Sequence, residues 1–479
     1  MSLSTALNSA MSGLTAASRA TDVVSQNIAN AMTPGYAARS LELSSYSAAG
    51  PGVRIVGVQR HSDPVIVSDR RGADAALGNA NTIANFHARF ESLVGTATDP
   101  NSISMRLANF ENSLVAAASY PDSAQRLDAV AHAASDLASS INDASEGLRK
   151  MRTQADTAIG NQVDRLNVAL VEIDELNSKI TSAQATGRDV SGLLDQRQLL
   201  VDEVNQIVPV NQVERDYGQI ALYTNGGAIL LDGTAATVEF SGVMDTVPEM
   251  TIDNGGLSGI SINGIAVDAR KVSGGTLAAN FEIRDNLAVS AQSDLDAVAR
   301  DLIERFETTT LDSTTVAGDP GVFTDGGVAF DPLLEIGLAS RISVNTLVDP
   351  AEGGESWRLR AGLGASDPGM PGESRLLQAY SAVLGEARTP GSSVFGTGLA
   401  TAAEIGSKLL SRAAQNAAFA DQALGFASTT QTELSRIELE QGVDTDSELQ
   451  TLMIVEQSYA ANARMIQAVD EMMELILGL

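Results

Sequence analysis

The sequence predicts a mainly α-helical fold with β insertions, and three observations lead to that prediction. Both ends of the 479-residue chain carry apolar residues at alternating steps of three and four, the spacing of a helix that packs along another helix. The segment 76–209 continues with helical periodicity. The segment 210–276 instead is rich in Gly and β-branched residues, with Asn-Gly and Asp-Gly turn signals typical of hairpins.

We expect long N- and C-terminal helices to form a coiled-coil core domain, next to a helical-bundle middle domain and an outer β-rich domain. A chain of this length is long enough for two or three domains. The predicted boundaries are 1–75 and 437–479 for the terminal core domain, 76–209, 277–310 and 372–436 for the helical domain, and 210–276 and 311–371 for the β-rich outer insertions.

The N-terminal helix is expected over the first thirty residues, and Pro34-Gly35 should stop it because Pro cannot continue the hydrogen-bond ladder. Its seam has a 3.5-residue repeat. The large apolar members of this predicted assembly seam are Leu3, Leu7, Leu14, Val24 and Ile28, with Ala10, Ala17 and Thr21 between them.

The C-terminal helix mirrors the first, and we expect the two to pair. Thr445 and Glu448 have the spacing of a capping box that would start this helix. Its predicted seam consists of Leu452, Val455, Tyr459, Asn462, Ile466, Val469, Met473 and Ile476. Alanines in the N-terminal seam supply little apolar area, so such a pair alone is marginal. We therefore expect both ends to be largely disordered in the monomer and to fold on assembly.

Between the ends, a strand is predicted at Val53–Val58 and helices from about 75 to 208, broken at Pro100 and at Tyr120-Pro121-Asp122. Gly160 and Gly187 are predicted to mark turns. A helix returns from about Leu277 to Thr310, and the chain is helical again from Ser374 to the end, with interruptions around 390–398 and at Gly442.

Composition excludes several classes of function. The chain has 31 basic and 60 acidic residues and a net charge of −29, which disfavours binding to nucleic acid or to an anionic membrane. It has no cysteine, so a disulfide framework, a thiolate metal site and a Cys nucleophile are excluded. No run of about 18 apolar residues could span a membrane. The N-terminus lacks a signal-peptide pattern, so we expect export to use a signal-peptide-independent route.

No constellation of residues points to catalysis, to a metal or to a cofactor. His61, His87 and His132 lie in unrelated segments without ligand spacing. Asp444, Asp446 and Glu448 resemble half of a calcium loop, but the required Gly is missing and helix capping is the better interpretation. We expect a non-enzymatic protein with no cofactor.

The residues after the N-terminal helix resemble a known signature. Residues 27–36, Asn-Ile-Ala-Asn-Ala-Met-Thr-Pro-Gly-Tyr, look like the NIANxxTPGY signature of flagellar rod, hook and hook-associated proteins. The matching family positions are Asn27, Ile28, Ala29, Asn30, Thr33, Pro34, Gly35 and Tyr36. The stretch 457–479 resembles the C-terminal signature of the same group. One departure is Ala37-Ala38-Arg39, where the family usually has Ser-Arg.

Internal motifs resemble the hook-associated protein 1 family, the first hook–filament junction protein. They are Asp195-Gln196-Arg197, Tyr120-Pro121-Asp122 with Arg126, and Gly274-Gly275 with Arg284-Asp285. The resemblance implies a structural subunit that joins the flagellar hook to the filament, with the terminal helices in an inner tube of coiled coils. It also implies an extracellular location and export through the flagellar type III apparatus.

The partners implied are other copies of the chain, the hook protein, the second junction protein and a cytoplasmic export chaperone at the C-terminal helix. Candidate chaperone-binding residues are Met453, Met465, Met472 and Met473, because methionine gives a soft apolar face that fits a groove. The alternatives are a hook, rod or second junction protein of the same axial class, and a secreted adhesin with a helical stalk.

Overall fold

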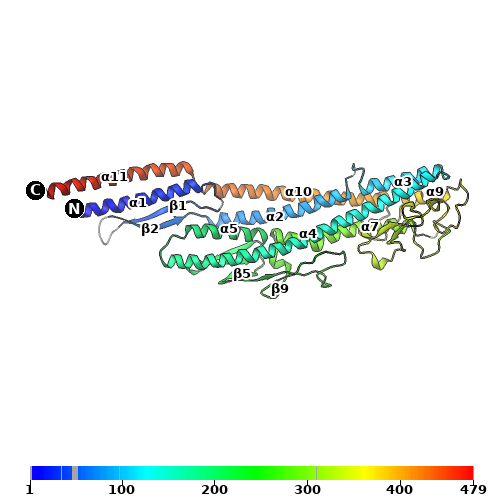
Figure 1. Cartoon of the computed structure of the whole chain (residues 1–479), viewed down its shortest axis with the longest axis horizontal. Helices are drawn as coiled ribbons and strands as arrows, with labels where there is room; N and C mark the ends of the chain where they lie inside the picture. The colour runs from blue at the N-terminus through cyan, green and yellow to red at the C-terminus, as the bar shows by residue number, and fades with distance from the viewer. Residues whose placement is uncertain (1–2, 34, 46–51, 97, 309, 478–479) are drawn as a thin grey trace.

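The protein is an elongated, mainly helical molecule whose two termini lie together at one end (Figure 1). The computed structural model describes residues 3–33, 35–45, 52–96, 98–308 and 310–477. The helices are α1 (Leu3–Asn30), α2 (Pro64–Val94), α3 (Ile103–Ser119), α4 (Ala124–Ala185), α5 (Ser191–Ile207), α6 (Gly275–Glu282), α7 (Ala288–Phe306), α8 (Arg358–Ala361), α9 (Arg375–Gly385), α10 (Ala402–Glu440) and α11 (Thr445–Leu477).

The strands are short and form small antiparallel sheets. A hairpin of β1 (Arg39–Ser45) and β2 (Val53–Arg60) follows α1. The other sheets are β3 (Val210–Glu214), β4 (Ile220–Thr224), β5 (Ile229–Asp232) and β6 (Thr234–Ala235); β7 (Val238–Glu239), β8 (Ile260–Ile262) and β9 (Ile265–Val267); and β10 (Phe323–Asp325) with β11 (Ile342–Val344). The prediction of a mainly α fold with β insertions is confirmed.

Most predicted elements are present, including α1, β2, α11 and the breaks near residues 100, 120, 390 and 442. One predicted turn is wrong, because Gly160 lies inside α4, a single helix of 62 residues. Its neighbours Ile159 and Val163 are buried in a core on either side. A helical Gly costs about 1 kcal/mol relative to Ala, which this burial outweighs. Gly187 does mark a turn, with φ of 68°.

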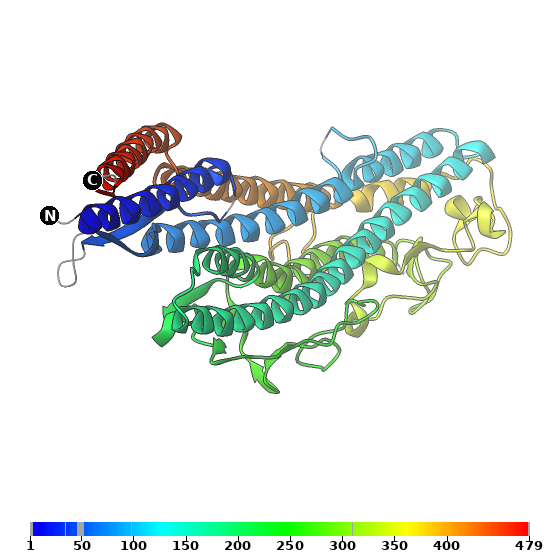
Figure 2. The same cartoon turned by 60° about the vertical axis from the view of Figure 1, so that its left-hand side comes forward.

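Two long helices, α2 and α10, lie alongside one another through the middle of the molecule (Figures 1 and 2). The side chain of Asp63 caps α2 by accepting from the backbone N–H of Val65 at 2.9 Å. A capping box starts α10: Thr401 Oγ1 accepts from Glu404 N–H, and Glu404 accepts from Thr401 N–H at 2.8 Å. Both helices therefore begin at residues that the local sequence specifies.

The core has two parts. One contains the first half of α4 with α3, α7, α9 and the start of α10, and its aromatic centre is Phe110, Phe306, Phe323 and Tyr380. The other contains the second half of α4 with α5, α6 and the strands β3 to β8. The two predicted β-rich segments therefore pack on different cores: 311–371 contributes Phe323 to the first, whereas 210–276 contributes Leu222 to the second.

The internal motif at 274–285 joins α6 to both cores. Gly274 and Gly275 have φ of 85° and 67°, and a side chain on Gly275 would meet the carbonyl oxygen of Ile207 at 2.3 Å. Arg284 lies in a π-helical turn and is fully buried. Its guanidinium donates to Asp156 Oδ1 at 2.8 Å and pairs with Asp285, so the sequence motif has a structural cause.

Candidate functional site

The two chain ends form an antiparallel helix pair. Gly13 of α1 faces Asn462 of α11, where a side chain on Gly13 would come within 2.8 Å of the Asn462 amide. Fourteen residues further along α1, Asn27 bonds Glu448, which lies fourteen residues before Asn462. The equal spacing on both helices fixes the register of the pair, and the small Gly13 allows the helices to approach closely.

The structure places the predicted seam residues unevenly. Val24 and Val469 are buried between the paired helices and their neighbours. Leu3, Leu7, Leu14, Ile28, Leu452, Val455 and Ile466 are half-buried, whereas Tyr459, Met473 and Ile476 are exposed. One chain therefore covers only part of the predicted seam.

Asn27 is the centre of the site and is fully buried. Its amide nitrogen donates to the carbonyl oxygen of Arg39 at 2.8 Å and to Glu448 Oε1 at 2.7 Å. Its amide oxygen accepts from Tyr36 OH at 2.8 Å and from the backbone N–H of Arg39 at 3.0 Å. All four hydrogen-bonding positions of the amide are satisfied, so one side chain joins α1, the loop 31–38, β1 and α11.

Glu448 was predicted to complete a capping box with Thr445, and that prediction is wrong. Asp444 caps α11 instead: its Oδ1 accepts from the backbone N–H of Asp446 at 3.0 Å and of Ser447 at 3.3 Å. Glu448 Oε1 is engaged by Asn27, 421 residues away in the sequence. Local spacing cannot reveal such a partner.

The remaining signature residues shape the loop after α1. Thr33 donates its backbone N–H to Asn30 O at 2.9 Å, which closes the helix end. Gly35 has φ of 76°, and a side chain there would come within 2.7 Å of Leu199 on α5. Ile28 is half-buried and Ala29 is exposed. Pro34 lies outside the described residues.

Tyr36 completes the loop, and its environment supports the Asn27 network. Burial raises the pKa of its hydroxyl, and the nearby carboxylates of Asp195 and Glu448 act in the same direction. The guanidinium of Arg39 lies 4.6 Å from the centre of the Tyr36 ring. The hydroxyl therefore stays protonated and donates to Asn27.

The internal Asp195-Gln196-Arg197 motif links this site to the helical middle. Asp195 of α5 accepts from Arg60 Nε of β2 at 2.7 Å and also pairs with Arg39 of β1. Arg197 points the other way, is buried, and donates to Asn177 Oδ1 of α4 at 2.9 Å. Burial lowers the pKa of Arg197 to about 10. The motif thus holds the β1–β2 hairpin on one side and the α4–α5 pair on the other.

A second charged cluster lies where α2, α5 and α10 meet. Arg70 pairs with Asp202 at 2.7 Å and also with Asp74 and Glu438, and Arg71 Nε donates to Asp202 Oδ1 at 2.5 Å. Burial acts to lower the pKa of Arg70, but the three carboxylates raise it overall. This cluster fixes α10 just before the chain turns into α11.

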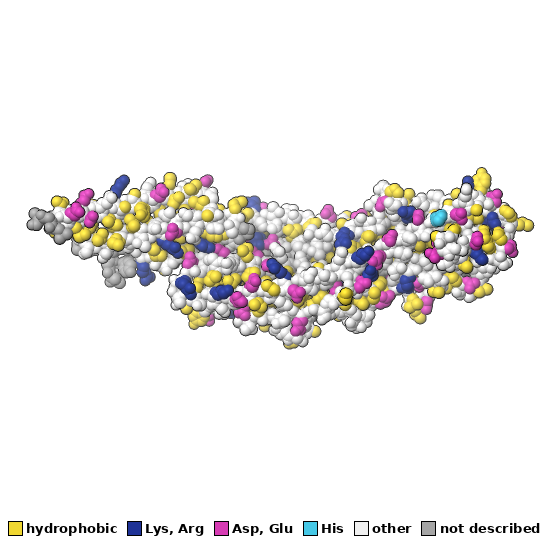
Figure 3. Space-filling view, in the orientation of Figure 1, with side chains coloured by type: hydrophobic (Ala, Val, Ile, Leu, Met, Phe, Trp, Pro, Cys, Tyr) yellow, Lys and Arg dark blue, Asp and Glu magenta, His cyan; other side chains and the backbone are white. Residues whose placement is uncertain are grey.

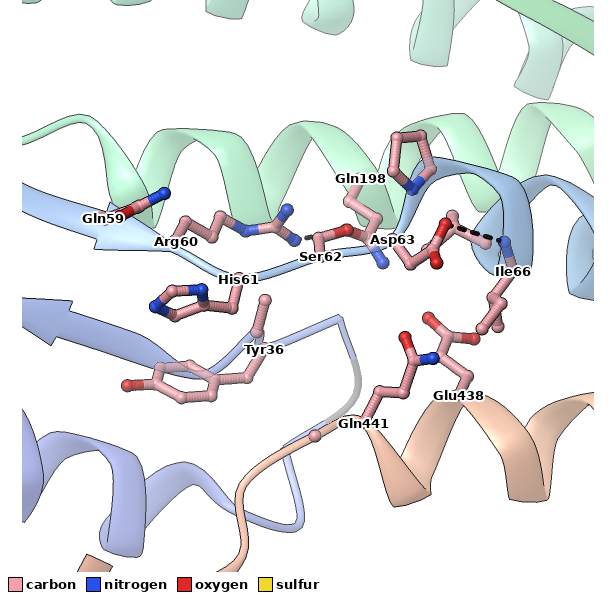
Figure 4. A pocket seen from close by; sticks show the side chains of 14 residues that line it. Tyr36, Gln59, Arg60, His61, Ser62, Asp63, Ile66, Gln198, Glu438 and Gln441 are labelled. Atoms are coloured by element: carbon pink, nitrogen blue, oxygen red, sulfur yellow. Dashed lines mark hydrogen bonds between the residues drawn. The ribbon is translucent and has the colours of Figure 1, made fainter.

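A polar cavity of about 540 Å³ opens between these two clusters (Figure 4). Tyr36, Arg60, His61, Gln198, Glu438 and Gln441 line it, from the signature loop, β2, α5 and α10 (Figure 4). Its polar groups have structural partners: Arg60 donates to Gln198 and Asp195, and His61 Nε2 lies 2.7 Å from Ser40 Oγ. The cavity lies where these elements meet, and the residues that line it form no nucleophile–base pair.

Neither a metal site nor a membrane span is present in the described part of the chain. Over the described residues, no three His, Asp or Glu side chains are placed to hold a metal ion. Over the same residues, no helix is long and apolar enough to cross a membrane.

The outer side of the helix pair is apolar and open. Large side chains of α11 project away from α1, among them Met453 at 60% exposure, Ile454 at 64% and Leu475 at 70%. The four methionines named as chaperone candidates, Met453, Met465, Met472 and Met473, are all exposed. Hydrophobic side chains gather at the end of the molecule that α1 and α11 form (Figure 3). Exposed apolar area of this extent marks an interaction surface.

Sequence reasoning missed Arg39, Arg60 and Glu448 as members of the site. Arg39 was noted only as a departure from the family pattern, and its contact with Asp195 depends on the fold. In the sequence, the Asp195-Gln196-Arg197 motif was the one feature that could have pointed to these contacts.

Comparisons with known proteins agree with this geometry. Two models cover the paired ends: "Flagella basal body rod protein" at 7–36 and "Flagellar basal body rod FlgEFG protein C-terminal" at 440–479. A third, "Flagellar hook-associated protein FlgK helical domain", covers 88–323. The ends therefore define the class, which is that of flagellar proteins with rod-type termini.

The relatives narrow the class. Flagellar hook-associated protein 1 of Salmonella typhimurium is 31% identical and that of Escherichia coli 28% identical over 243 residues, 49% of this chain and 44% of each relative. The matched region thus spans less than half the length of these relatives. The protein of the same name from Bacillus subtilis is 23% identical over 98% of this chain and 97% of its own. The chain belongs to the flagellar hook-associated protein 1 family.

One solved structure is similar in part. It is the flagellar hook junction protein FlgK from Burkholderia pseudomallei, with a TM-score of 0.46 and 20% identity over 54% of this chain and 47% of that one.

Proposed function

We propose that this protein is a structural subunit that joins the hook of a bacterial flagellum to its filament and assembles through its paired terminal helices. The observation that carries the proposal is the helix pair itself. One chain pairs α1 with α11 through Asn27 and Glu448, yet leaves Met453, Ile454 and Leu475 exposed. Large apolar side chains that a helix leaves exposed are stabilised when other helices cover them, and neighbouring copies would supply those helices.

The proposal also divides the chain into three parts. In this proposal residues 1–75 and 437–479 form the coiled-coil core, 76–209, 277–310 and 372–436 form the helical domain, and 210–276 and 311–371 are outer insertions. The charged clusters around Asp195 and Arg70 support it, since they fix the terminal pair to the helical middle.

The proposed partners are other copies of the chain along the ring, the hook protein on one side and the second junction protein on the other. A cytoplasmic export chaperone would cover the C-terminal helix before assembly, and the exposed Met453, Met465 and Met472 support this. Export through the flagellar type III apparatus to the outside of the cell completes the proposal. The same proposal makes the chain a non-enzymatic protein.

The test uses isolated hooks, the purified chain and filament subunits, with electron microscopy as the readout. Hooks treated with the unaltered chain should accept filament subunits, and hooks treated with Val469→Asp should not, because Val469 is buried in the terminal pair. Gln467→Asp is the matched control, since it adds the same charge at an exposed position on the same helix.

Filaments that grow equally well with and without the unaltered chain would refute the proposal. So would a Gln467→Asp chain that fails as completely as Val469→Asp, because the loss would then follow from charge and not from helix pairing.

A further inference from the structure

Three methionines surround the buried Val469 on α11. Met465 precedes Val469 by four residues, and Met472 and Met473 follow it by three and four. Residues three or four apart are neighbours on a helix, so these side chains border the buried position on both sides. They are 50%, 46% and 39% exposed, whereas Val469 is 2% exposed. We call Met465, Met472 and Met473 the Val469 methionines: they lie beside the helix contact and are still accessible to solvent.

The helix contact at this level is short of apolar area. Val469 follows Asn462 by seven residues, so antiparallel pairing brings it level with Ala6, which precedes Gly13 by seven residues. The main packing partner of α11 is α1, and Ala6 is half-buried there. An alanine covers little of the facing helix, so the longer methionine side chains supply much of the apolar cover around Val469.

Methionine is also the one sulfur-containing residue type in this chain, because cysteine is absent. No thiol of the chain therefore competes with the thioethers for a two-electron oxidant. With hydrogen peroxide, a sulfur lone pair attacks one peroxide oxygen, the O–O bond breaks, an S–O bond forms and water leaves. The sulfur loses two electrons and the peroxide gains them. The product, methionine sulfoxide, is polar, and methionine sulfoxide reductases convert it back to methionine.

We propose that the Val469 methionines are a reversible oxidation site of the unassembled chain, at which a peroxide forms sulfoxides that weaken the terminal helix pair and its assembly. The inference rests on the proposed function and adds a chemical control to the same helix pair. A sulfoxide oxygen beside Val469 has to be hydrated, because burying it without a hydrogen-bond donor is unfavourable. Water then enters a contact that has little apolar area to lose.

Other methionines of the chain provide internal controls. Met151 is 4% exposed and belongs to the first core, so it should be oxidised slowly. Three exposed methionines lie outside the terminal pair, and they are Met105, Met244 and Met370. They should be oxidised without an effect on assembly.

The experiment treats the full chain with dilute hydrogen peroxide, locates the added oxygen by mass spectrometry of peptides, and measures co-sedimentation with isolated hooks. We expect the Val469 methionines to be oxidised at least about fivefold faster than Met151. Half-saturation of hooks should require roughly tenfold more of the oxidised chain, and treatment with reductases for both sulfoxide epimers should restore the original value. This recovery tests the site without any substitution.

Leucine keeps the volume of methionine and cannot be oxidised, so it isolates the contribution of the three positions. After the same peroxide treatment, the binding of one triple variant should weaken by less than about threefold: Met465→Leu, Met472→Leu and Met473→Leu. The matched control should remain as sensitive to peroxide as the unaltered chain: Met105→Leu, Met244→Leu and Met370→Leu.

Three results would overturn the inference while the proposed function stands. They are an oxidised chain that binds hooks as tightly as the untreated chain, a loss of binding that the reductases do not reverse, and equal behaviour of the two triple variants after oxidation. An untreated, unaltered chain that does not attach to hooks would instead refute the proposed function, and the inference with it.

Discussion

Replacing Asn27 by Ala removes the one side chain that joins α1, the signature loop, β1 and α11. The fully buried amide makes four hydrogen bonds, to Tyr36, to Glu448 and twice to the backbone of Arg39. Tyr36, Glu448 and Arg39 are all half-buried, so water can replace some of these partners, and we count the equivalent of two of the four bonded groups as left unpaired. At about 1.5 kcal/mol for each such group, the change costs about 3 kcal/mol.

If the ends fold on assembly, this cost appears in the affinity for the hook. A loss of about 3 kcal/mol corresponds to a roughly hundredfold higher Kd. The assay is co-sedimentation of the fluorescently labelled chain with isolated hooks over a range of concentrations. Asn8→Ala is the matched control, because Asn8 is exposed on the same helix. Asn27→Asp adds a second test: it keeps the shape but places a carboxylate against Glu448, and it should bind at least as weakly as Asn27→Ala.

The reasoning would be refuted by an Asn27→Ala chain that binds hooks within threefold of the unaltered protein. Equal weakening by Asn8→Ala would refute it as well, since the effect would then report helix propensity and not the buried network.

Three further predictions follow from close contacts and buried charges. Gly13→Val should weaken hook binding about tenfold by pushing the helices apart at Asn462, and Asn462→Ala in the same chain should restore most of it, as co-sedimentation would show. Burial raises the pKa of Asp296 to about 6, so the folded state holds this proton more tightly than the unfolded state does. The free energy of unfolding that the bound proton contributes is therefore lost as the pH rises through about 6. From pH 4.5 to 7 the unaltered chain should therefore lose about 2 kcal/mol that Asp296→Asn does not lose, measured by urea unfolding followed by circular dichroism. Arg284→Met should lower the free energy of unfolding by about 3–5 kcal/mol because it leaves Asp156 buried without its cation. Adding Asp156→Asn should recover part of this loss. A double variant that is less stable than Arg284→Met alone would contradict the prediction.

The sequence determined the extents of the terminal helices and the family. The 3.5-residue repeat located α1 and α11, because apolar residues on one face of a helix recur in the sequence at steps of three and four. The breaks at Pro100 and Tyr120-Pro121-Asp122 were equally readable, since Pro acts on its own backbone. The signature at residues 27–36 is local, and the family model at 7–36 covers it.

Only the tertiary structure decided what the signature does. Asn27 reads in the sequence as one polar residue of a motif, yet it is fully buried because Glu448 and Arg39 arrive from segments 421 and 12 residues away. For the same reason Glu448 was assigned to a local capping box, although its carboxylate accepts a hydrogen bond from the distant amide of Asn27. Gly160 was read as a turn because intrinsic propensity is a weak preference, and the burial on either side of it overrides that preference. Backbone preferences and periodicity depend on the residues of one short segment and can be predicted from it. The partner of a buried polar group depends instead on how the whole chain packs.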